Sequence, residues 1–154
     1  MHHTLLTLHS ITRWLVLTSL IYGIWMAWEG YRSGRQFSRF NNSVRHITAT
    51  IAHIQLMLGL SLYMISPVVK YNVIEAEGHS LVSEHTFFRL IHLLLMVVAV
   101  VLITIGSARA KRIETAGLKF RTILIWFSLA LLIILVAIPW PFSPFAHRPY
   151  FRFF

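Results

Sequence analysis

The sequence predicts an all-α membrane protein, a four-transmembrane-helix bundle with up-down-up-down topology that forms a single domain over residues 1–154. Two bulk properties favour this fold class. Hydrophobic residues make up 56% of the chain and charged residues only 12%, and the mean hydropathy is +0.67; soluble domains carry about 25% charged residues. The third observation is length, because the apolar segments reach the ~20 residues that a helix needs to cross a bilayer core of roughly 30 Å.

Four apolar segments have this length. The predicted helices cover residues 5–28, 44–66, 84–108 and 118–138. Pro67 and Pro139 end the second and fourth helices, since proline lacks an amide proton and interrupts helical hydrogen bonding. Short connections make consecutive helices antiparallel neighbours, so the first and third helices stand diagonally across the core. Residues 139–154 form a tail rich in proline and aromatic residues, which we expect to lie at the membrane interface.

Lysine and arginine predict the orientation. The connection over residues 29–43 and the connection over residues 109–117 each hold a cluster of Arg or Lys, whereas residues 67–83 hold one Lys and two Glu. The positive-inside rule places the two basic connections in the cytoplasm and both termini on the outer side. The same rule explains the formal net charge of +9, and we therefore expect the lipid bilayer, and no nucleic acid, as the partner of this chain.

Several kinds of chemistry are excluded by composition. The chain has no Cys, and all five of its acidic residues are Glu. Disulfides, thiolate metal sites and cysteine nucleophiles are therefore absent. The shortage of carboxylates argues against catalysis by paired carboxylates, and no phosphate-binding glycine loop is visible.

Five ionisable residues inside the predicted helices require an explanation, because such residues are costly in lipid and usually functional. At ~1.5 Å per residue, His9 and His92 lie about 30 and 25 Å above the cytoplasmic ends of their helices, and His53 about 12 Å. His9 and His92 thus fall at similar depth on diagonal helices. Arg13 and Arg89 are close to them in sequence, and we expect both arginines to lie toward the outer side.

Two imidazoles at matching depth in a dry bundle suit the axial ligation of haem iron. We predict one haem b held by His92 and His9, with His53 as the alternative partner ligand. Arg13 and Arg89 would balance the haem propionates. One haem fits better than two, because the fourth predicted helix has no deep histidine.

Two other interpretations stay open beside the haem site. The histidines are also of the kind that hydrogen-bond to neighbouring helices, and the arginines of the kind that extend to the headgroups. The chain would then be a haem-free accessory subunit that stabilises a larger membrane complex. A copper site formed by His9, His53 and His92 is the third possibility.

The motifs at these residues resemble those of a known family. They are LHSITRW in the first helix, AHIQLMLGLSLYMISP in the second, HLLLMVVAVVLITIG followed by SARAKR in the third, and IPWPF and RPYF near the end. They are similar to small bacterial four-helix integral membrane proteins of the cytochrome b type. The resemblance implies an electron-transfer protein or oxidoreductase subunit of the respiratory chain in the bacterial inner membrane, with its termini periplasmic. It also implies exchange of electrons with a quinone pool or a partner redox subunit, in a larger respiratory complex, and haem ligands among His9, His53 and His92.

Overall fold

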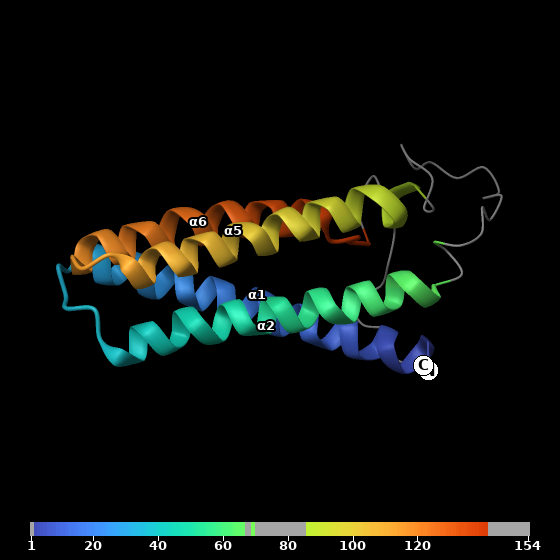
Figure 1. Cartoon of the computed structure of the whole chain (residues 1–154), viewed down its shortest axis with the longest axis horizontal. Helices are drawn as coiled ribbons and strands as arrows, with labels where there is room; N and C mark the ends of the chain where they lie inside the picture. Colours follow the sequence, from blue (N-terminus) through green and yellow to red (C-terminus); the bar gives the residue numbers. More distant parts are fainter. Residues whose placement is uncertain (1, 67–68, 70–85, 142–154) are drawn as a thin grey trace.

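The computed structural model describes residues 2–66, 69 and 86–141, and every regular element in these ranges is helical. The elements are α1 (His2–Arg32), α2 (Arg39–Ile65), the six-residue π-helix η1 (Phe87–His92), which continues directly into α5 (Leu93–Arg112), and α6 (Ala116–Ala137). They form four long rods packed side by side (Figure 1). The predicted all-α four-helix bundle is confirmed.

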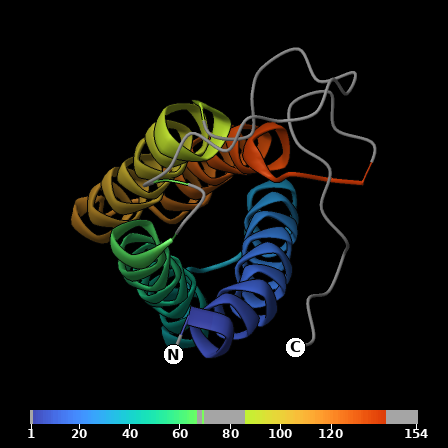
Figure 2. The same ribbon diagram turned by 90° about the vertical axis from the view of Figure 1, so that its right-hand side faces the viewer.

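The four rods form a closed ring of neighbours (Figure 2). Helix α1 contacts α2 and α6, and α5 contacts the same two helices, so α1 and α5 stand diagonally across the core as predicted. The start of α1, the end of α2, the start of η1 and the end of α6 share one end of the bundle, which we call the His2 end (Figure 1). The opposite end, where the two basic connections lie, is the Arg32 end.

The helices extend further toward the Arg32 end than hydrophobicity predicts. Helix α2 begins at Arg39 rather than near residue 44, because Ser38 and Asn41 form a capping box in which each side chain accepts the other's backbone N–H. Helix α1 continues to Arg32, and Gly34, with φ of 62°, lies in the turn that follows. Helix α5 continues through its basic residues to Arg112.

The helices approach one another closely near the Arg32 end. The Cα of Gly30 lies against the Phe120 ring, and that of Gly106 against Trp126, so a methyl group at either glycine would collide with the aromatic side chain. Arg45 is buried here and donates from Nη1 to the Ser107 carbonyl oxygen at 2.8 Å. These contacts fix α1 to α6, α5 to α6 and α2 to α5.

The outer surface of the bundle is apolar. Four helices are long and apolar enough to cross a membrane, and large side chains such as Trp25, Met57 and Leu132 are more than half exposed. These features fit a multi-pass protein in contact with lipid. Residues 142–154 of the predicted tail lie outside the described residues, as does nearly all of the connection over residues 67–83.

Candidate functional site: a histidine-lined cavity

A cavity of about 190 Å³ opens inside the His2 half of the bundle. Side chains from all four helical rods line it, and most of them are aliphatic. The polar exceptions include His9 and Arg13 from α1, Gln55 from α2 and His92 from η1. The cavity therefore combines an apolar wall with a few converging polar groups, which is the usual composition of a ligand site.

One face of α1 supplies a polar stripe along the cavity. His2, Leu6, His9, Arg13 and Val16 all line it, and their spacing of three or four residues places them on the same side of the helix. Because α1 runs inward from the His2 end, the stripe progresses from His2 at the end of the bundle to Val16 near its middle. The sequence analysis did not select His2 as a site residue.

His92 is held by a backbone contact on α6. Its Nδ1–H donates to the carbonyl oxygen of Ala137 at 2.8 Å, near the end of α6, and the Phe87 and Phe88 rings lie 5.8 and 5.9 Å from its own. This contact fixes the tautomer, so Nε2 keeps its lone pair. Nε2 has no hydrogen-bond partner in the described part of the chain. The π-helical turn that ends at His92 is a feature frequent at functional sites.

His9 is held from the opposite side by α2. The amide nitrogen of Gln55 donates to the His9 carbonyl oxygen at 3.0 Å and lies 3.4 Å from His9 Nε2. The Thr12 hydroxyl bonds to the Gln55 side-chain oxygen. The His9 ring packs over Gly59, where an added methyl carbon would come within 3.2 Å of Cε1. Within the described residues, the buried Nδ1 of His9 has no hydrogen-bond partner.

Arg13 brings a positive charge into the cavity. Its guanidinium lies 5.5 Å from the ring centroid of Trp14, which in turn makes an edge contact with Trp140. Arg13 lines the same cavity as His9 and His92. Arg13 is one helical turn further from the His2 end than His9, so it lies on the inner side of the two imidazoles.

Arg89 lies outside the cavity, although it was expected to balance a haem propionate there. It is exposed and is not part of the cavity lining. Since η1 also runs inward from the His2 end, Arg89 precedes His92 on the outer side, opposite to Arg13. The two arginines thus flank the level of the imidazoles instead of lying together, and only Arg13 faces the interior.

His53 stands apart from the other two deep histidines. It is exposed and does not line the cavity. Its Nδ1–H donates to the Ala49 carbonyl oxygen at 2.7 Å, and Nε2 lies 3.1 Å from the Thr104 hydroxyl on α5. Of the three candidate ligands, the structure therefore brings together His9 and His92 only. In the ranges that the structure describes, no three His, Cys, Asp or Glu side chains gather to hold a metal ion, and the copper alternative has no support there.

Three contributors to this site were not selected as site residues from the sequence. Gln55 and Gly59 are one turn apart on α2 and support His9, and the Ala137 carbonyl supports His92. The spacing of Gln55 and Gly59 is a usable signal, because residues four apart share a helix face. A backbone carbonyl at the end of a helix leaves no such signal in the sequence.

We compared the chain with models of protein families, with curated proteins and with solved structures, and none of them matches. The likeness to bacterial cytochromes b thus rests on the short motifs alone.

Proposed function

We propose that this protein is a membrane-embedded electron carrier that holds one b-type haem between His9 and His92. The observation that carries the proposal is that these imidazoles, from diagonal helices, line one cavity, each with a ring nitrogen that no described protein group uses. When bound, the haem would supply an iron that alternates between ferric and ferrous states without covalent chemistry on the protein.

His92 has the environment expected of a metal ligand. Ligating histidines usually donate their second ring N–H to a carbonyl or carboxylate, which orients the ring and raises the basicity of the ligating nitrogen. The bond from Nδ1 to the Ala137 carbonyl meets this description and leaves Nε2 as the available donor atom.

His9 would be the second ligand. A buried ring nitrogen without a partner is costly, and a bound group in the cavity would remove that cost by engaging the imidazole. Gln55 and Gly59 restrict where the ring can lie, because one bonds to His9 and the other leaves space for it.

Arg13 would tune the haem. Its charge shares a mostly apolar lining with both imidazoles, so it would favour the reduced, less positive iron and suit an anionic propionate. Arg89, which is exposed and outside the lining, is not included in this role.

Binding of a porphyrin requires the cavity to widen. Its volume of about 190 Å³ is below the roughly 300–1,000 Å³ of pockets that hold drug-sized ligands. Leu6, Leu93 and Met96 line it with flexible side chains that can change rotamer. We therefore expect haem to bind by displacing these side chains while the Arg32 half of the bundle stays closed.

The partners of the carrier follow from its location. Its apolar helices suit the bilayer, and we propose the bacterial inner membrane, with electrons exchanged with a quinone pool or with a redox subunit of a respiratory complex. One haem accounts for His9 and His92, and His53 has hydrogen-bond partners of its own.

A visible spectrum of the full-length protein, purified in detergent from haem-supplemented cells, tests the proposal. We expect a Soret band and an α-band in the reduced-minus-oxidised difference spectrum. His92→Ala and His9→Ala should abolish both bands, whereas His53→Ala, a matched control at an exposed histidine, should retain them. A colourless protein would favour a haem-free accessory subunit. Full haem content in both cavity variants would show that the ligands are wrongly assigned.

A further inference from the structure

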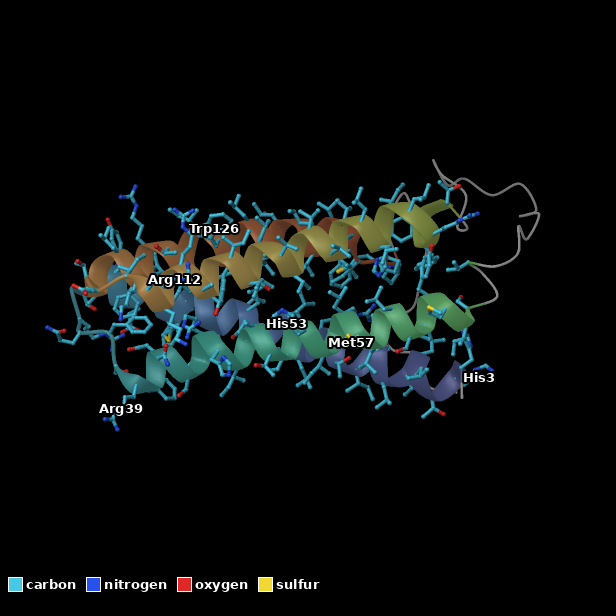
Figure 3. All side chains as sticks on the ribbon, viewed as in Figure 1. His3, Arg39, His53, Met57, Arg112 and Trp126 are labelled. Atoms are coloured by element: carbon cyan, nitrogen blue, oxygen red, sulfur yellow. The ribbon has the colours of Figure 1, made fainter. Side chains whose placement is uncertain are left out.

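An exposed imidazole lies at mid-height on the lipid-facing side of the bundle. Figure 3 shows His53 about halfway along α2, next to the seam between α2 and α5. Ionisable residues at such a depth normally face the bundle interior or a water-filled cavity. His53 and its partner Thr104 are instead both exposed.

The hydrogen bonds of this pair leave room for one more donor. The Ala49 carbonyl takes the proton on His53 Nδ1, so Nε2 of the neutral ring is an acceptor. The Thr104 hydroxyl has a single proton but two acceptors, Nε2 at 3.1 Å and the Val100 carbonyl oxygen at 2.7 Å. If the proton goes to the Val100 carbonyl, Nε2 lacks a donor; if it goes to Nε2, the hydroxyl oxygen of Thr104 can still accept one.

The surroundings select the kind of molecule that can provide this donor. Met57 is one turn beyond His53 on α2 and 65% exposed, and Val101 is one turn before Thr104 on α5 and 47% exposed. Such a surface faces acyl chains, where water is scarce. The donor must therefore belong to a molecule dissolved in the bilayer. The thioether of Met57 favours an aromatic molecule, because thioethers pack well against aromatic rings.

We propose that the His53–Thr104 pair binds the hydroxyl group of a membrane-dissolved hydroquinone. The inference rests on the proposed electron-carrier function, for which it names the chemical class of the reduced partner. A hydroquinone carries phenolic O–H donors on a flat ring, and one of them satisfies the open acceptor. The oxidised quinone has only carbonyl acceptors, so it gains nothing from this site and binds more weakly.

The test is equilibrium binding of a benzohydroquinone with a ten-carbon chain to the full-length protein in detergent, under anaerobic reducing conditions. The comparison ligands are the corresponding quinone and a simple ten-carbon alcohol, which separates hydroquinone recognition from binding of any lipid hydroxyl. The variants are Thr104→Val and His53→Leu. Thr122→Val is the matched control, because Thr122 is exposed on α6 and donates to its own helix at Leu118 as Thr104 does at Val100.

We expect the hydroquinone to bind about tenfold more tightly than the quinone or the alcohol, and each seam variant to lose about tenfold in affinity. Thr122→Val should bind as the unaltered protein does. Equal affinity for the three ligands, or unchanged binding by Thr104→Val with a normal helical circular dichroism spectrum, would overturn the inference. Haem content is measured in the same samples. Hydroquinone binding without haem would refute only the electron-carrier function, and haem without hydroquinone binding only the seam site.

Discussion

Substitution of Gln55 by leucine should loosen His9 without changing the shape of the lining greatly. Gln55 links α2 to α1 through the His9 carbonyl oxygen at 3.0 Å, the His9 ring at 3.4 Å and the Thr12 hydroxyl. Leucine keeps much of the side-chain volume and removes all three contacts. Thr12 keeps a hydrogen bond after this substitution, because its hydroxyl also donates to the Leu8 carbonyl oxygen at 2.8 Å. The loss therefore falls mainly on His9.

The magnitude follows from these contacts. Hydrogen bonds between membrane helices contribute about 0.6 kcal/mol on average and up to about 1.7, so the two contacts to His9 together predict a loss of about 1–2 kcal/mol in unfolding free energy. Removal of groups that orient a metal ligand lowers metal affinity by about 10- to 100-fold. We expect haem to leave Gln55→Leu faster by a factor in that range.

Two assays on the same samples check this prediction. Unfolding by sodium dodecyl sulfate gives the change in stability, and transfer of haem to an excess of apomyoglobin gives the dissociation rate. Gln36→Leu, at an exposed glutamine in the connection between α1 and α2, controls for the change of residue type. If Gln55→Leu matched Gln36→Leu in stability and haem release, Gln55 would have no part in positioning His9.

Two further predictions concern packing and charge. Gly106→Ala should lower the unfolding free energy by about 1–3 kcal/mol, because the new methyl group would collide with Trp126 close to the Trp126 backbone. The control Gly117→Ala should be neutral or slightly stabilising, because no atom lies within 4 Å of the added methyl group. Equal stabilities of the two variants in detergent unfolding would contradict the close contact between Gly106 and Trp126. Arg13→Met should lower the haem midpoint potential by tens of millivolts, because it removes a positive charge near the iron. Arg89→Met should leave the midpoint potential unchanged. Redox titration measures both potentials, and equal shifts in the two variants would refute the assignment of Arg13 to the cavity.

The helix content and the diagonal arrangement of α1 and α5 could be predicted from hydropathy and connection length. The ends of the helices could not, because the segments were bounded where apolar residues stop. The polar turns at Arg39 and Arg112 remain helical all the same. Ser38 and Asn41 cap one of them through side-chain hydrogen bonds, which are independent of hydrophobicity.

Depth along a helix predicted part of the candidate site. It grouped His9 with His92, which line one cavity, and separated His53, which lies on the outer surface. Depth does not show which side of a helix faces inward, so it could not predict that Arg89 is exposed. Both helices run inward from the His2 end, so Arg13, after His9, is deeper, and Arg89, before His92, is shallower.

The two halves of the bundle differ in a way that suits a bound cofactor. In the Arg32 half, glycines let aromatic rings approach the backbone, and Arg45 ties α2 to α5 through the Ser107 carbonyl. In the His2 half, Gly59 faces the polar imidazole of His9, and a cavity takes the place of part of the close packing. Because a cavity forfeits dispersion contacts, the His2 half has the most to gain from a ligand. We therefore expect haem to raise the unfolding free energy chiefly by protecting the amides of η1 and of the first turns of α1 from hydrogen exchange. The amides around Gly106 should be protected with or without haem, because the contacts there are already complete. Uniform protection of both halves on haem binding would contradict a cofactor held at the His2 end.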